Sequence, residues 1–349
     1  MENKDKKHKR RIRYKGTHPK SYKDKYKELQ PEVYPETIER VMQKGSTPAG
    51  MHRPILVDEI LDFLQVKPNQ VGLDATLGYG GHTLEILKCM DFKGQLYATD
   101  VDPIELPKTQ KRLEALGYGS SILKIRHMNF SNIDKIVEES GPLDFILADL
   151  GVSSMQIDNP ERGFTFKTDG PLDLRLNPSK GRPASEKLPL FTIDELEGML
   201  IENADEPYAR EIAKAITSYI KSGKKITTSS TLQEIIGKAL NFIPANKRDL
   251  EIKKSAQRTF QALRIDINDE LEVLYYFLEK IPSSLKKGGK VAILSFHSGE
   301  DRLVKKSFQH YLREGIYSEI VKGPIRPSSE EINSNPRARS AKLRWAIKG

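Results

Sequence analysis

The sequence predicts an α/β protein whose parallel sheet is interrupted by a helical insert. Three observations support this class. A short apolar strand, a glycine-rich turn and the start of a helix follow one another between Val71 and Leu87. Strand and helix patterns then alternate as far as Leu150. From about Asp158 to Ser255 this alternation gives way to helical patterns, and the sheet pattern then returns. Such alternation indicates a parallel sheet, whose ligands bind at the carboxyl ends of the strands.

Charge is distributed unevenly along the 349 residues, of which 37% are hydrophobic and 30% charged. Residues 1–30 hold 12 Lys/Arg against 4 Asp/Glu, whereas the rest of the chain holds 45 against 44. The net charge of +9 therefore belongs mostly to the N-terminal segment. We predict three parts: a basic, largely disordered extension over 1–50, a sheet domain over 51–157 and 256–349, and an inserted helical domain over 158–255.

The basic extension also carries Tyr14, Tyr22 and Tyr26. Blocks of like charge are usually disordered and solvated. Interleaved lysines and tyrosines also suit non-specific binding of nucleic acid, because cations release counterions and rings stack on bases. Both descriptions can hold together. We expect the extension to add affinity for RNA without adding specificity.

Cysteine usage and hydropathy exclude several classes of protein. The single cysteine, Cys89, rules out an intramolecular disulfide. The polar N-terminus lacks the apolar region of a signal peptide, and no apolar run reaches the ~18 residues of a membrane span. The histidines and carboxylates show no metal-binding spacing, and G-x-S-x-G does not occur. We expect a cytoplasmic protein with neither a membrane partner nor a metal.

The glycine-rich turn indicates a nucleoside ligand. A dinucleotide fingerprint requires G-x-G-x-x-G, and here Gly78 and Gly80 are followed by Thr83 instead of a third glycine. Asp100 ends the next predicted strand, about 20 residues past the turn, where a carboxylate can bind a ribose. That spacing suits NAD and S-adenosylmethionine equally well. The turn alone does not decide between them.

Further strands are predicted over 122–130, 143–150, 258–265 and 291–296, with a last one near Trp345. Asp149 lies at the carboxyl end of the 143–150 strand, where a parallel sheet presents its ligand. An aspartate in that position is as often a turn former or a helix cap as a catalytic group. Position alone leaves these two roles equally open.

Seven segments between His52 and Arg344 together resemble the RsmH family, also called MraW, of S-adenosylmethionine-dependent ribosomal RNA methyltransferases. They occur in the family's order, which makes the set much more specific than any member. The segments are Gly80–His82, Asp149–Ser154, Glu161–Phe164, Asp169–Arg175, Arg258–Arg264, Ser295–Ser298 and Asn335–Ser340.

The resemblance implies a class I, Rossmann-like methyltransferase with an inserted helical domain. Its substrate would be the exocyclic N4 of a cytidine in 16S ribosomal RNA, reached within the small ribosomal subunit. A homodimer is one of the assemblies that the sequence permits. The resemblance also implies cofactor contacts: Gly80, Gly81 and His82 at the methionine end, Asp100 on the ribose, Phe130 by the adenine, and Asp149 and Gln156 completing the pocket.

The implied reaction suggests further roles. Cytosine N4 is a poor nucleophile because its lone pair is delocalised into the ring. An acceptor aimed at an N4 hydrogen would orient that lone pair, and we assign this role to Asp149, aided by Ser153; cofactor binding is the alternative role for Asp149. Candidates for substrate contacts are Arg175, Arg258, Arg264, Arg337, Arg339 and His297. For each arginine a surface or ion-paired role is the alternative, and His297 can instead support its loop.

Two other functions are compatible with parts of the sequence. An NAD-dependent oxidoreductase would use the same turn and ribose carboxylate, although the missing third glycine argues against it. A non-catalytic RNA-binding or ribosome-assembly protein would bind RNA without transferring a methyl group.

Overall fold

The computed structural model describes residues 54–349, so the predictions for the basic extension over residues 1–50 lie outside the described range. Within that range seven strands form one sheet in the order β3-β2-β1-β4-β5-β7-β6. β7 is antiparallel to both of its neighbours, whereas β1 to β5 pair in parallel. The strands are β1 (Val71–Asp74), β2 (Gln95–Asp100), β3 (Leu123–His127), β4 (Leu143–Asp149), β5 (Leu285–Ser295), β6 (Tyr317–Ile320) and β7 (Lys342–Lys348).

Helices cover both faces of this sheet, as the parallel pairing predicts. Along β4 the side chains alternate: Phe145 and Leu147 pack with one set of helices, Ile146 and Ala148 with the other. On the first face lie α3 (Val57–Leu64), α4 (Gly81–Met90) and α5 (Leu106–Ala115). On the second face lie α6 (Ile133–Ser140), α13 (Glu270–Ser284) and α14 (Ser298–Arg313).

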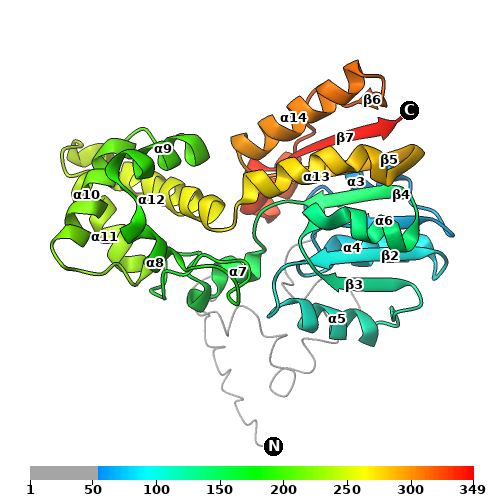
Figure 1. Cartoon of the computed structure of the whole chain (residues 1–349), viewed down its shortest axis with the longest axis horizontal. Helices are drawn as coiled ribbons and strands as arrows, with labels where there is room; N and C mark the ends of the chain where they lie inside the picture. Colours follow the sequence, from blue (N-terminus) through cyan, green and yellow to red (C-terminus); the bar gives the residue numbers. More distant parts are fainter. Residues whose placement is uncertain (1–53) are drawn as a thin grey trace, which may run out of the picture.

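A separate hydrophobic cluster holds the helical region together. Figure 1 shows this region beside the sheet, with α7 and the α12–α13 junction between the two. Its helices are α8 (Ala184–Lys187), α9 (Ile193–Ala204), α10 (Ala209–Lys221), α11 (Ser229–Ala239) and α12 (Ala245–Ile267), and α7 (Ser154–Asp158) precedes them. The predicted helical insert is therefore present. Among residues 54–349 no helix is long and apolar enough to cross a membrane.

The predicted strand over 258–265 is wrong, because these residues belong to the 23-residue helix α12. Ala256, Phe260 and Leu263 are spaced i, i+4, i+7 and therefore lie on one face of the helix. All three are buried in the hydrophobic cluster of the helical region. The helix also runs past the predicted domain boundary between Ser255 and Ala256. We keep the inserted domain as a proposal, with α12 as one of its helices.

The sheet order changes direction at β1, which has β2 on one side and β4 on the other. In open α/β sheets a ligand crevice forms at such a switch point, outside the carboxyl ends of the strands. Asp74 ends β1 and Asp149 ends β4, so two carboxylates meet at this place. A short helix near the C-terminus, α15 (Ser329–Ser334), supports the adjacent surface through Glu331, which accepts a hydrogen bond from the backbone N of Leu56.

Candidate functional site

A cavity of about 700 Å³ opens at the switch point of the sheet. Residues from the ends of β1, β2, β4 and β5 line it, together with α7 and the α12–α13 junction. Ten of the predicted site residues line this cavity: Gly81, His82, Asp100, Phe130, Asp149, Ser153, Gln156, Arg264, His297 and Arg337. Gly80, Arg175, Arg258 and Arg339 are not among its lining residues.

The glycine turn forms the start of α4. Gly80 is the N-cap residue with φ 68°, a left-handed conformation that glycine adopts without strain. The backbone N–H of Gly78 donates to Asp100 Oδ2 at 2.7 Å, which fixes the turn against the end of β2. Helix α4 therefore begins at the cavity, where the first N–H groups of a helix favour an anionic group such as a carboxylate.

Both carboxylate oxygens of Asp100 already accept hydrogen bonds from the protein backbone. Its Oδ2 accepts from Gly78, and its Oδ1 accepts from the backbone N–H of Asp102 at 2.8 Å. Each carboxylate oxygen can accept a second hydrogen bond, so two ribose hydroxyls can still be bound. Burial raises the pKa of Asp100 to about 6, and the two backbone hydrogen bonds only partly oppose that shift.

Asp149 lies beside His82 on the floor of the cavity. Its Oδ2 is 3.6 Å from His82 Nδ1, and His82 Nε2 is 3.0 Å from the carbonyl oxygen of Ile55. Because a carbonyl only accepts, His82 Nε2 carries a hydrogen and donates it to Ile55. Burial raises the pKa of Asp149 to about 6, against the opposing effect of His82.

One oxygen of Asp149 is buried without a hydrogen-bond partner. Among the described residues nothing donates to Oδ1, although the side chain as a whole is 32% exposed. A buried, unpaired carboxylate oxygen is unfavourable unless a donor or a cation reaches it. The site therefore offers a positively charged or hydrogen-bonding ligand a strong partner at this position.

Asp74 is a site residue that our sequence analysis did not single out. It is buried, lines the cavity and accepts from Thr83 Oγ1 at 2.6 Å. Burial raises the pKa of Asp74 despite this hydrogen bond. Its position as the last residue of β1, directly before the glycine turn, was the signal that could have identified it.

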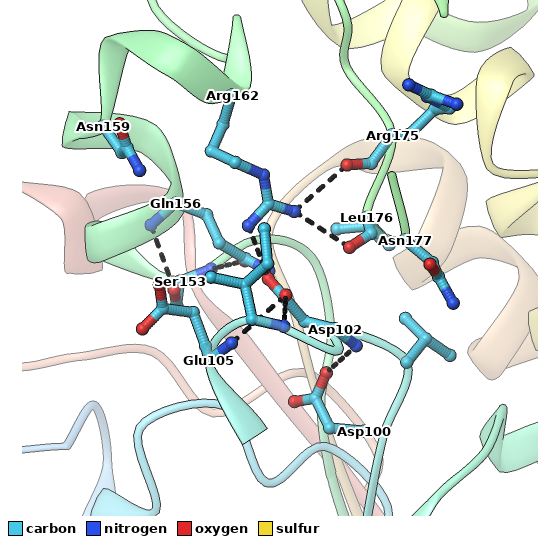
Figure 2. Close-up of polar contacts among 12 residues, drawn as sticks. Asp100, Asp102, Glu105, Ser153, Gln156, Asn159, Arg162, Arg175, Leu176 and Asn177 are labelled. Carbon is cyan, nitrogen blue, oxygen red and sulfur yellow. Dashed lines mark hydrogen bonds and ion pairs between the residues drawn. The ribbon is translucent and has the colours of Figure 1, made fainter. Parts of the chain in front are cut away.

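Ser153 and Gln156 form a capping box at the start of α7. Ser153 Oγ accepts from the backbone N–H of Gln156, and Gln156 Oε1 accepts from the backbone N–H of Ser153 at 2.9 Å. The amide nitrogen of Gln156 donates to Asp102 Oδ2 at 2.7 Å, as Figure 2 shows. Both polar ends of Gln156 are thus bound by the protein, while the residue lines the cavity.

Four of the predicted RNA-binding arginines are ion-paired, as our alternative for them allowed. Arg264 donates two hydrogen bonds to Glu270, and Arg175 donates two to Asp173. Arg258 pairs with Glu206 at 2.7 Å and Arg337 with Asp158 at 2.6 Å. Arg339 is exposed. RNA binding by these residues stays a prediction, and Arg264 and Arg337 are the two placed at the cavity.

His297 belongs to a charge network that lines the same cavity as Asp149. It caps α14, where its Nδ1 accepts from the backbone N–H of Glu300, and its Nε2 is 3.2 Å from Glu300 Oε1. Glu270, His297 and Glu300 present ligand atoms within 4.8 Å of one another. The guanidinium of Arg264 already neutralises Glu270, so the cluster holds its own cation.

Known proteins resemble this chain over nearly all of its length. A model of the MraW methylase family matches residues 49–349. Ribosomal RNA small subunit methyltransferase H 2 of Alkaliphilus metalliredigens is 67% identical over 348 residues, covering 100% of both chains. Methyltransferase H 1 of Lachnoclostridium phytofermentans is 65% identical, covering 99% of this chain and 95% of its own. Methyltransferase H of Halothermothrix orenii is 40% identical, covering 84% and 97% respectively.

Proposed function

Because the chain belongs to the MraW methylase family, we propose that it transfers a methyl group from S-adenosylmethionine to the N4 amine of a cytidine in 16S ribosomal RNA. The observation that supports this chemistry best is Asp149, whose buried Oδ1 lacks a partner at the switch point of the sheet. We further propose that the protein acts in the cytoplasm on RNA of the small ribosomal subunit. The arrangement of the site suits both S-adenosylmethionine and a cytidine.

The residues around the cavity fit S-adenosylmethionine. We assign Gly80, Gly81 and His82 to its methionine end, where α4 begins, and Asp100 to the ribose hydroxyls. Phe130 is assigned to the adenine, since its ring lines the cavity and is held edge-on against Phe277 at 4.9 Å. When bound, S-adenosylmethionine supplies an electrophilic methyl group on a positively charged sulfur.

Asp149 is the residue that we assign to the amine. Its carboxylate accepts a hydrogen bond from N4, which localises the nitrogen lone pair and orients it. The N4 hydrogen becomes acidic as the new N–C bond forms, and Asp149 takes that proton and passes it to solvent. Alignment and electrostatics supply most of the rate in such a site. Ser153 holds the adjacent turn through its capping box and lines the cavity, and we assign it the supporting role beside Asp149.

A labelled methyl transfer tests the proposed function directly. The purified protein is incubated with S-adenosylmethionine carrying a labelled methyl group and with either naked 16S RNA or small subunits from cells that lack the gene. We expect label on N4 of one cytidine, with subunits the better substrate. RNA that is bound but never labelled would contradict the function, and label on another atom would contradict the role of the N4 amine.

A further inference from the structure

Asp102 is a fully buried carboxylate just past the end of β2, and its hydrogen-bond partners all belong to the protein. Its side chain is 0% exposed. Oδ1 accepts from the backbone N–H groups of Ile104 and Glu105, ahead of α5. Oδ2 accepts from Gln156 Nε2 and from Arg162 Nη1, both at 2.7 Å. Figure 2 shows these contacts converging on the one carboxylate.

Arg162 connects the Asp102 carboxylate to residues 175 and 176, which precede the helices of the helical region. Its side chain is 5% exposed, and its Nη2 donates to the carbonyl oxygens of Arg175 at 3.2 Å and Leu176 at 2.9 Å. The Arg162 guanidinium therefore joins Asp102 to the Arg175–Leu176 segment, while Gln156 joins the same carboxylate to α7 (Figure 2). Because Gln156 and Leu176 line the cavity, residues 153–177 form what we call the rim.

The same contacts continue in both directions. Toward the glycine turn, the backbone N–H of Asp102 donates to Asp100, which also accepts from the backbone N–H of Gly78. Toward the helical region, the N–H of Leu176 donates to Asn268 Oδ1 at 2.7 Å, at the α12–α13 junction. A continuous hydrogen-bonded path thus joins the glycine turn, the ribose carboxylate, the rim and the helical region.

A buried ion pair is a weak source of stability, since desolvation offsets most of its attraction. Its best-attested use is to select one arrangement of the chain over others. Here the pair joins the ligand-binding end of β2 to a rim that holds only short helices. Elements of this kind have low local stability and are easily biased by ligands.

We propose that Arg162 is a positioning residue that couples binding at Asp100 to the order of the rim. A ligand that fixes Asp100 also fixes Asp102, and Arg162 transmits this constraint to residues 153–177. The rim that borders the substrate side of the cavity is then ordered by the methyl donor before RNA arrives. The inference depends on the proposed function only for the identity of the ligand at Asp100.

Hydrogen exchange measured by mass spectrometry tests this coupling, with S-adenosylhomocysteine as the probe. In the wild-type protein the probe should slow exchange both in the glycine turn, residues 76–83, and in the rim. In Arg162→Met the glycine turn should stay protected, while protection of the rim by the probe falls about tenfold. Arg126→Met is the matched control, because Arg126 forms an exposed ion pair with Glu139 away from the rim and should leave both effects intact.

Arg162→Met leaves Asp102 buried without a cation, a change that strongly destabilises the folded state. The double variant Asp102→Asn/Arg162→Met removes both charges and keeps the Oδ1 acceptor ahead of α5. It should fold and lack rim protection. Retained rim protection in either folded variant refutes the coupling, and so does a wild-type rim that the probe leaves unprotected while it protects the glycine turn. If the probe protects neither segment in the wild type, the proposed donor site fails as well.

Discussion

Two walls of the same cavity carry buried acidic side chains in opposite electrostatic states. The carboxylate wall consists of Asp74, Asp100 and Asp149, at the ends of β1, β2 and β4. Burial raises the pKa of all three, to about 6 for the last two. The network wall consists of Arg264, Glu270, His297 and Glu300. Burial also acts to raise the pKa of Glu300, but His297 and Arg264 outweigh it and hold that pKa below its usual value.

The difference shows what each wall can bind. Desolvated carboxylates without a cation of their own gain most when a positively charged ligand arrives. The network wall already contains a cation, the Arg264 guanidinium paired with Glu270, so it gains less from a second cation. We therefore expect a sulfonium donor to lie against the carboxylate wall, with the pyrimidine between Asp149 and the network wall.

Breaking the network wall should have the largest effect, and the effect should be on stability. Arg264→Met leaves Glu270 buried without its cation, and we expect the free energy of unfolding to fall by about 4 kcal/mol. Arg264→Met/Glu270→Gln should recover much of that loss. Arg210→Met, which removes an exposed ion pair, is the control and should leave the urea midpoint unchanged. A small loss in Arg264→Met would mean that the network is not structural.

Breaking the carboxylate wall should affect turnover more than stability. Asp149→Asn keeps the shape of the side chain but loses the charge that orients N4, so kcat at saturating donor should fall about a hundredfold. Labelled methyl transfer at saturating donor measures kcat, and titration with the donor shows separately whether donor affinity has changed. Asp134→Asn, whose exposed carboxylate pairs with Lys280, is the control. Full turnover by Asp149→Asn would remove the acceptor role and leave cofactor binding as its only one.

Donor affinity should depend on pH through the same wall. A cation favours the ionised carboxylates, so binding lowers their pKa values and releases protons. Affinity for S-adenosylmethionine should therefore rise by up to about tenfold per pH unit on approaching pH 6 from below, and level off above about 7. Calorimetric titration at several pH values measures this. Asp149→Asn should reduce the pH dependence and leave the part that comes from Asp100, and an affinity that is constant from pH 5 to pH 8 would contradict the raised pKa values of the carboxylate wall.

The smallest effect is expected at Phe130. Phe130→Leu keeps an apolar side chain at the cavity but removes the aromatic face assigned to the adenine. We expect donor affinity to fall about fivefold, with kcat at saturating donor nearly unchanged. Equilibrium binding of S-adenosylhomocysteine checks this, and an unchanged affinity would place the adenine elsewhere.

The sequence predicted the regular part of the fold because that part depends on local patterns. The β1–turn–α4 unit and the strand ending at Asp149 could be identified from apolar runs and glycines. The error over 258–265 came from treating an apolar stretch as a strand, although Ala256, Phe260 and Leu263 follow a helical period. The helix α6 and the edge strand β6 were missed because neither carries a continuous apolar run.

Local patterns identified the glycine turn, Asp100 and Asp149, and the resemblance supplied the more distant site residues. The roles of Gly81 and His82 follow from the resemblance to the RsmH family, and that of Asp100 follows from its spacing to the glycine turn. The partners of the arginines do not, because nothing local shows that Arg162 meets Asp102 across 60 residues. Ion pairing of this kind depends on how the helical region folds back onto the sheet, and that information is spread over the whole core.

A crystal structure with S-adenosylmethionine bound is the most direct test of where the donor lies. We predict the sulfonium beside Asp149 and His82, with the ribose hydroxyls on Asp100 and the adenine against Phe130. A donor bound outside this cavity, or one whose sulfonium faces the Arg264–Glu270 network instead, would contradict the division between the two walls.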